Sequence, residues 1–169
     1  MLTLTKYMRQ LMFSALALVM MTSAGCGFHL QGSYSIPPQL RTLSLITPDQ
    51  YSELSRLVQD RLRLHNISVK PVSAKLPRLT LMKDSLERST LSIYPTGNVA
   101  EYELIYRVFF SVAMPDKEAQ SFTAEVRRDY LDDPRTALAK SREMDLLVKE
   151  MRVQAADYII QTLAATEVK

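Results

Sequence analysis

The sequence predicts an α+β fold, a two-layer sandwich in which two helices pack on one face of a mixed, mostly antiparallel sheet of four to five strands. Three observations predict it. The expected elements follow the order strand, helix, strand, three extended segments and helix. Apolar residues alternate from Tyr102 to Met114, as in a strand with one buried face. A final apolar stripe recurs at helical spacing up to Leu163, long enough to cover a sheet diagonally.

The composition of residues 1–25 predicts a lipoprotein signal peptide that is cleaved. Lys6 and Arg9 give this segment a positive start without acidic residues, and the apolar run that follows, 11–21, has eleven residues. A helix that spans a membrane needs about 20 apolar residues. The run therefore suits a secretory signal better than a retained transmembrane anchor.

Cys26, the only cysteine, directly follows the small residues Ser23, Ala24 and Gly25. Bacterial lipoproteins are cleaved and acylated at such a cysteine, so we expect an S-diacylglycerol group and an N-palmitoyl group on Cys26. A secreted domain held by disulfides would instead have an even number of cysteines. Three acyl chains would anchor the protein stably, because two lipid signals already do so.

The residue after the cysteine is Gly27, whereas an aspartate there favours retention in the inner membrane. We therefore expect a lipid-anchored protein on the periplasmic side of the outer membrane. Residues 26–39 are expected to form the acylated tether, and residues 40–169 a single α/β domain. The segment 1–25 holds two of the 21 basic residues and none of the 18 acidic ones, so the rest has a net charge of +1. This balance and the expected location argue against a nucleic-acid partner.

The first half of the domain predicts a strand, a helix and a second strand. Apolar and polar residues alternate over 40–46, which favours a strand. Thr47 is expected to cap an amphipathic helix over 48–64, because Pro48 fits the first helical position. A second strand is expected over 67–72.

The second half predicts three extended segments. Residues 79–93 predict a strand that is bent or bulged, and 94–98 has the composition of a turn. The strand 102–114 has one apolar face and an opposite face that changes from charged to apolar. A connection over 115–120 leads to a partner strand, which gives a long antiparallel hairpin. The apolar positions of that partner strand are Phe122, Ala124 and Val126.

The last helix is expected to be capped by Asp132 or Asp133, with Pro134 at its start. Its apolar residues have the spacing of a helix that packs against a sheet. They are Met144, Leu147, Val148, Met151, Ala155, Tyr158, Ile159 and Leu163.

The sequence contains no standard catalytic or metal-binding pattern. The two histidines, His29 and His65, lie outside any His-x-x-x-His context, and the four glycines leave no loop that could cradle a phosphate. Glu101 and Glu103 share a strand face, but a solvated surface or an ion pair is the commoner role of such a pair. We therefore expect no catalytic residues, no metal site, no cofactor and no enzyme activity.

Basic residues gather where the last strand meets the last helix. Two interpretations remain open: a mixed, solvated surface, which the residues alone favour, or a basic edge for a phosphorylated ligand. The basic residues are Arg127, Arg128, Arg135, Lys140 and Arg142, and the acidic residues among them are Asp129, Asp132 and Asp133.

Three segments share residues and spacing with a known family. They are Cys-Gly-Phe-His-Leu at 26–30, Gly-Asn-Val-Ala-Glu-Tyr-Glu-Leu at 97–104, and a third set at Arg128, Tyr130, Asp133, Pro134, Ala137, Leu138, Ala139, Lys140, Glu143, Lys149, Glu150, Met151, Ala155 and Ala156. Together they resemble the family of the outer-membrane lipopolysaccharide-assembly lipoprotein LptE, also called RlpB. The likeness covers most of residues 26–165 in order and spacing.

The resemblance implies a small α/β lipoprotein that plugs the large β-barrel protein LptD in a 1:1 complex. The pair would insert lipopolysaccharide into the outer leaflet of the outer membrane. The resemblance also implies a lipopolysaccharide contact at Lys140, near the start of the last helix, and a weaker one at Arg128. Some relatives have a further basic residue in the loop before the Glu-Tyr strand, where this chain has Tyr94, Pro95 and Thr96.

Two other roles remain open from the sequence. One is a general envelope scaffold lipoprotein, such as an accessory subunit of the outer-membrane barrel-assembly machinery. The other is an enzyme acting on envelope polymers. A stoichiometric complex with one very large β-barrel would distinguish the plug from the scaffold.

Overall fold

The computed structural model describes residues 35–133 and 136–166, together with Tyr7, Met12 and Ser14. Apart from these three residues, the expected signal peptide lies outside the described residues. The same holds for Cys26 and for the expected tether up to residue 34. Within the described part, no helix is both long enough and apolar enough to cross a membrane.

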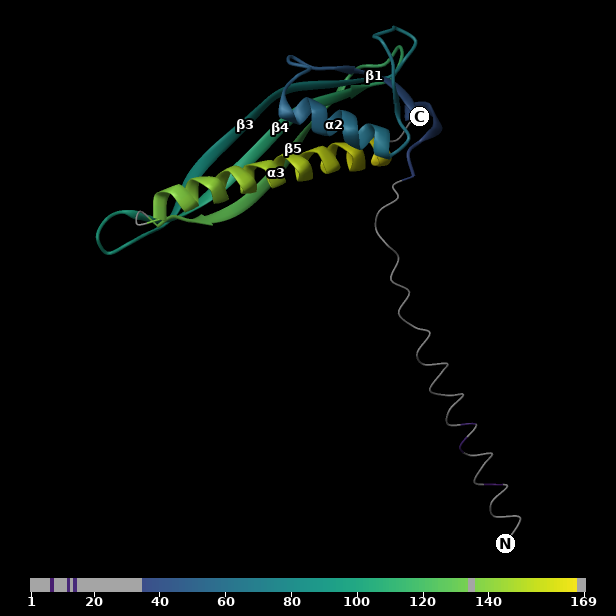
Figure 1. Cartoon of the computed structure of the whole chain (residues 1–169). Helices are drawn as coiled ribbons and strands as arrows, with labels where there is room; N and C mark the ends of the chain where they lie inside the picture. The colour runs from purple at the N-terminus through teal and green to yellow at the C-terminus, as the bar shows by residue number, and fades with distance from the viewer. Residues whose placement is uncertain (1–6, 8–11, 13, 15–34, 134–135, 167–169) are drawn as a thin grey trace. The chain divides into compact units, whose positions relative to one another are not determined.

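A five-stranded sheet carries two helices on one of its faces, which confirms the predicted two-layer α+β fold (Figure 1). The strand order is β2-β1-β3-β4-β5, in which β1 is parallel to both of its neighbours and the other pairs are antiparallel. The elements are the 3-10 turn η1 (Pro38–Leu40), β1 (Thr42–Ile46), α2 (Glu53–Leu64), β2 (Ser68–Val69), β3 (Arg78–Ile93), β4 (Val99–Ala113), β5 (Gln120–Leu131) and α3 (Ala137–Ala165).

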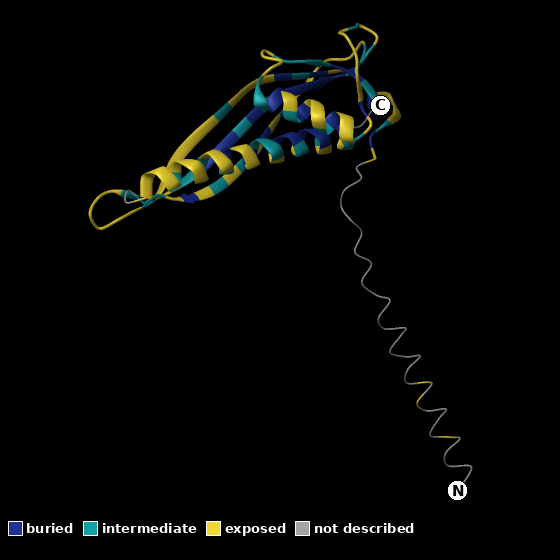
Figure 2. Ribbon diagram, in the orientation of Figure 1, coloured by how far each residue is buried: buried dark blue, intermediate teal, exposed yellow. Residues whose placement is uncertain are grey.

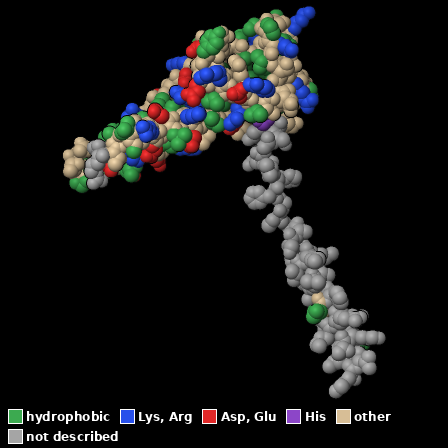
Figure 3. Space-filling model, in the orientation of Figure 1, with side chains coloured by type: hydrophobic (Ala, Val, Ile, Leu, Met, Phe, Trp, Pro, Cys, Tyr) green, Lys and Arg blue, Asp and Glu red, His purple; other side chains and the backbone are tan. Residues whose placement is uncertain are grey.

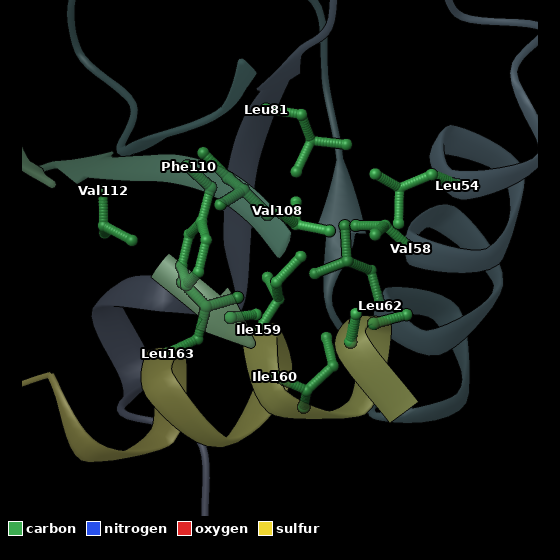
Figure 4. Packing of buried hydrophobic residues seen from close by; sticks show 14 of the residues in the cluster. Leu54, Val58, Leu62, Leu81, Val108, Phe110, Val112, Ile159, Ile160 and Leu163 are labelled. Carbon is green, nitrogen blue, oxygen red and sulfur yellow. The ribbon is translucent and has the colours of Figure 1, made fainter. Parts of the chain in front are cut away.

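Strand β4 supplies the centre of the core. Its apolar face is buried as the alternation predicts, at Leu104, Tyr106, Val108, Phe110 and Val112. Figure 4 shows Val108 and Phe110 packed among buried side chains of both helices. The labelled helix residues are Leu54, Val58 and Leu62 of α2 and Ile159, Ile160 and Leu163 of α3.

Helix α2 begins five residues later than predicted. Its N-cap is Ser52, whose side chain accepts a hydrogen bond from the Ser55 N–H, so the prediction of Thr47 as the cap was wrong. The reason is local: the Asp49 carboxylate accepts from the N–H of Tyr51, two residues on, which holds the chain in a turn instead of a helix. The Thr47 hydroxyl instead pairs with the Ser55 hydroxyl at 2.7 Å.

The predicted second strand is reduced to the two residues of β2. Helix α2 ends with Asn66 in the left-handed region, and the Ile67 N–H bonds back to the Leu62 carbonyl. The Lys70 N–H still reaches the Leu43 carbonyl on β1. Pro71 follows and has no N–H to donate, so the ladder stops there instead of continuing to residue 72.

Helix α3 begins at Ala137, and its N-cap residue is Thr136. The prediction of Asp132 or Asp133 as the cap was therefore wrong. The Asp132 N–H donates to the Ala100 carbonyl, which extends the hydrogen bonding of the sheet past the end of β5. A residue whose backbone continues the sheet in this way does not begin a helix. Pro134, which was expected at the helix start, lies outside the described residues.

Strand β3 is irregular, as the sequence predicts. Its register against β4 shifts between Leu81 and Asp84 and again close to the turn at 94–98. In that turn the Gly97 N–H donates to the Tyr94 carbonyl, and Gly97 has a φ of +86°, which glycine adopts without strain.

Burial is uneven along the sheet. Figure 2 shows the buried residues concentrated beneath α2 and the C-terminal half of α3, whereas the far end of β3 and the β3–β4 turn are largely exposed. Two ion pairs join the helices where both are present, Arg152 with Glu53 and Arg61 with Asp157. The start of α3 therefore packs on the sheet without support from α2.

Replacing Leu62 with Ala is expected to lower the free energy of unfolding by about 2–5 kcal/mol, because the side chain is fully buried in the core and leaves a cavity. Leu64 is the matched control, since it has the same side chain on the same helix but is 68% exposed. Leu64→Ala should change the free energy of unfolding by no more than about 0.5 kcal/mol. Urea denaturation of both variants measures the difference, and equal losses would contradict the assignment of the core.

Candidate functional site

Lys140 lies in the first turn of α3 and is held by two contacts. Its Nζ donates to Glu143 Oε2 at 2.8 Å and lies 5.3 Å from the centre of the Tyr130 ring. The bond to Glu143 raises the pKa of Lys140 above its ordinary value. The amine is therefore charged, and its two contacts orient it. The side chain is 17% exposed, so the amine is also partly accessible.

Tyr130 joins the start of α3 to the sheet. It lies on β5 directly opposite Tyr102 on β4, is 4% exposed, and donates its hydroxyl proton to the Lys140 carbonyl at 2.8 Å. Burial, above all, raises the pKa of the Tyr130 hydroxyl, so the group stays a donor. The position of Lys140 is therefore set by its backbone as well as by its side chain.

The end of the sheet away from α2, where Lys140 lies, also has exposed apolar side chains, but they point to the helix-free face and to the side of α3 away from Lys140. We call this region the distal end, formed by residues 91–99, 131–133 and 136–140. Leu131 follows Tyr130 directly and is 51% exposed, and Leu138 precedes Lys140 by two residues and is 71% exposed. The Tyr94 hydroxyl donates to the Asp132 carbonyl at 3.2 Å, which ties the β3–β4 turn to the same region.

Arg128, the other expected ligand residue, is directed away from Lys140. Its guanidinium donates to the Arg127 carbonyl at 2.8 Å and to Gln154 Oε1 at 2.7 Å. Gln154 lies 14 residues after Lys140, about 21 Å along the helix axis. The bond to Gln154 joins the edge strand β5 to α3. The structure therefore does not bring the two predicted residues together.

The remaining basic residues are also dispersed. Arg127 is on the opposite face of β5 from Arg128 and pairs with Glu103 and Glu125. Arg142 is exposed on α3, and Arg135 lies outside the described residues. On the face shown in Figure 3, basic and acidic side chains are mixed over α2 and α3. A mixed, solvated surface is therefore the better description of the basic residues as a group. Lys140 differs from the others because its amine is held over the Tyr130 ring.

A network of ion pairs crosses the helix-free face of the sheet. Arg107 on β4 bonds Glu87 on β3 and Glu125 on β5. Arg127 bonds Glu125 and continues the network to Glu103 on β4. These charges satisfy one another across three strands, so this face is polar but presents little unbalanced charge.

The described residues do not form a metal site, because no three of their His, Cys, Asp or Glu side chains gather closely enough to hold an ion. His65 is the C-cap residue of α2, and His29 lies outside the described residues. Glu101 accepts a hydrogen bond from the Ser92 hydroxyl at 2.7 Å, and Glu103 pairs with Arg127. Both carboxylates therefore have the cross-strand contacts that the sequence favoured.

Comparisons with known proteins agree with one another. The LptE family model, described as lipopolysaccharide-assembly, matches residues 40–163. An LPS-assembly lipoprotein LptE from Pectobacterium atrosepticum is 36% identical over 159 residues, covering 92% of this chain and 86% of that protein. Another from Photorhabdus laumondii is 37% identical over 149 residues, covering 88% of this chain and 82% of that protein.

Solved structures share the fold. The crystal structure of the rare lipoprotein B from Shewanella oneidensis has a TM-score of 0.71 and 68% sequence identity, covering 75% of this chain and 96% of that one. A minor lipoprotein from Acinetobacter baumannii has a TM-score of 0.63 at 18% identity, covering 76% of this chain and 94% of that one. At that identity the second likeness concerns the fold alone.

Glu125→Gln is expected to make the free energy of unfolding less dependent on pH in the acid range. The pKa of the Glu125 carboxyl is lowered, because Arg107 and Arg127 donate hydrogen bonds to it. Its contribution to stability is therefore complete above the ordinary pKa of about 4.3 and is lost as the pH falls through the lowered value. Urea denaturation between about pH 6 and about pH 3 measures this loss. Glu118→Gln, at an exposed residue, is the control and should keep the wild-type slope, whereas a wild-type slope in Glu125→Gln would contradict the role of the network.

Proposed function

The chain belongs to the LptE family of lipopolysaccharide-assembly proteins, and on this premise we propose that it is an outer-membrane lipoprotein that acts in lipopolysaccharide assembly. In this proposal the acylated Cys26 holds the protein on the periplasmic side of the outer membrane. The domain plugs the LptD β-barrel in a 1:1 complex and contacts lipopolysaccharide as it passes. The role is one of assembly and binding, without a catalytic step.

The surface of the domain suits a plug. The interior of a transmembrane β-barrel is polar, so a protein that fills it needs a polar outer surface and a rigid framework. The helix-free face offers hydrogen-bonded charges at Arg107, Glu125 and Arg127, which suit a polar wall. Helix α3 contacts both β4 and β5 and is linked to α2, which gives the domain its rigidity.

The distal end carries the proposed contact with lipopolysaccharide. Lipopolysaccharide is an amphiphile whose phosphate groups are joined to acyl chains, so its site needs a cation beside apolar surface. Lys140 supplies an oriented ammonium, and the distal end also has exposed apolar side chains at Leu131, on the helix-free face, and at Leu138, on the side of α3 away from Lys140. The oriented ammonium of Lys140, held at Glu143 and over the Tyr130 ring, is the observation that carries the proposal. Arg128 is the weaker candidate, because its donors already bond Arg127 and Gln154.

Lys140→Gln should lower the affinity for purified lipopolysaccharide about tenfold, as expected for loss of a hydrogen bond to a charged group. The complex with the barrel should remain intact, because the substitution changes one side chain at the distal end. Lys149→Gln, at an exposed residue of the same helix, is the control for the loss of one charge and should bind as the wild type does. Arg128→Gln should have a smaller effect than Lys140→Gln. Unchanged affinity in Lys140→Gln would remove Lys140 from the site.

Detergent extraction followed by purification through a carboxy-terminal tag should recover one very large β-barrel protein at a 1:1 ratio. Mass spectrometry of the same preparation should find the amino-terminal peptide acylated at Cys26. A general scaffold would instead recover other envelope proteins without a stoichiometric barrel. An unmodified Cys26 would contradict the anchor, and the absence of a barrel would contradict the plug.

A further inference from the structure

Glu143 occupies the place that an anion would take at Lys140. Its carboxylate accepts from Lys140 Nζ at 2.8 Å, across one turn of α3. The buried Tyr130 ring covers another side of the ammonium, with 5.3 Å between Nζ and the ring centre. An incoming phosphate must therefore displace Glu143 or bind beside its negative charge.

The two partners of Lys140 differ in how easily they can leave. Tyr130 is 4% exposed and is fixed in the core, with its hydroxyl bonded to the Lys140 carbonyl at 2.8 Å. The Glu143 side chain is 47% exposed and has free solvent to rotate into. Loss of the Glu143 contact would leave the ammonium above the Tyr130 ring, still charged and still placed.

We propose that Glu143 is a built-in competitor that keeps the binding of phosphate groups at Lys140 weak and reversible. The inference rests on the proposed function, in which Lys140 contacts the phosphates of lipopolysaccharide. A phosphate monoester carries a charge between −1 and −2 and three acceptor oxygens, so it can replace a single carboxylate at an ammonium. The cost of breaking the exposed ion pair is then subtracted from the affinity of every ligand that binds there.

Such competition suits a site through which a ligand passes. A lysine without a counter-ion would hold a phosphorylated amphiphile longer, because nothing in the protein would replace the ligand as it leaves. Glu143 is three residues from Lys140 on the same helix, so it can return to the ammonium as soon as the phosphate departs. The pair thus lowers the barrier to release without changing the position of the cation.

Glu143→Gln should raise the affinity for purified lipopolysaccharide about two- to fivefold, the range set by the strength of exposed ion pairs. The pKa of Lys140, followed by NMR, should fall in this variant, because the bond to Glu143 is what raises it. Glu150→Gln is the matched control. It removes the same charge from an exposed position of the same helix, and among the described residues Glu150 has no ion-pair partner.

The proposal requires that the higher affinity of Glu143→Gln for lipopolysaccharide depends on Lys140. In the Lys140→Gln background, Glu143→Gln should therefore no longer change the affinity. With dephosphorylated lipopolysaccharide, Glu143→Gln and the wild type should bind equally. A gain of equal size in Glu150→Gln, in the Lys140→Gln background, or with the dephosphorylated ligand would overturn the proposal in favour of a general charge effect.

The same measurements separate this inference from the proposed function. If Lys140→Gln weakens binding but Glu143→Gln behaves as Glu150→Gln does, the lipopolysaccharide contact stands and only the competition is wrong. If Lys140→Gln binds lipopolysaccharide as the wild type does, the proposed contact at Lys140 is wrong, and so is the proposed competition by Glu143.

Discussion

Burial of the apolar face of β4 is the interaction on which the rest of the structure depends. Val108 and Phe110 are fully buried, and each side chain of this size contributes about 1.5–3 kcal/mol when it leaves water. The two helices cover this face together, and the ion pairs of Arg152 with Glu53 and of Arg61 with Asp157 keep them in place. The opposite face of β4 needs no cover because its central charges, beginning with Arg107, are paired across the neighbouring strands.

The unequal lengths of the helices decide where a functional surface can form. Helix α2 has 12 residues and covers one end of the sheet, whereas α3 has 29 residues and extends beyond α2. At the distal end α3 therefore depends on the sheet alone, through Tyr130 and its bond to the Lys140 carbonyl. Leu131 remains exposed there because it points to the helix-free face, and Leu138 because it lies on the side of α3 away from Lys140 and Tyr130. The partly accessible ammonium of Lys140 thus lies where the covered part of the sheet ends.

Some predictions from the sequence rested on periodicity and turn chemistry, and these were confirmed. The alternation along β4, the bulged strand β3 and the turn around Gly97 are all local patterns, in which each residue's environment follows from its neighbours in the chain. The start of α2 was predicted wrongly because Asp49 and Ser52 both offer side-chain oxygens to nearby N–H groups. Which of these residues begins the helix also depends on the hydrogen bond between the Thr47 and Ser55 hydroxyls. These two groups come together only after the chain has turned.

The sequence by itself determined the order of the elements and the buried faces of β4 and β5, and its resemblance to a family pointed to Lys140 and Arg128 as residues that could contact a phosphate. Only the tertiary structure shows which groups surround each of them. A basic side chain is equally charged wherever it lies in the chain, so its availability depends on the groups that the fold places around it. Arg128 bonds Gln154 on α3, whereas Lys140 lies over the ring of Tyr130 and bonds Glu143. The contacts of Arg128 with Gln154 and of Lys140 with Tyr130 join residues of β5 and α3, and no spacing in the sequence specifies them.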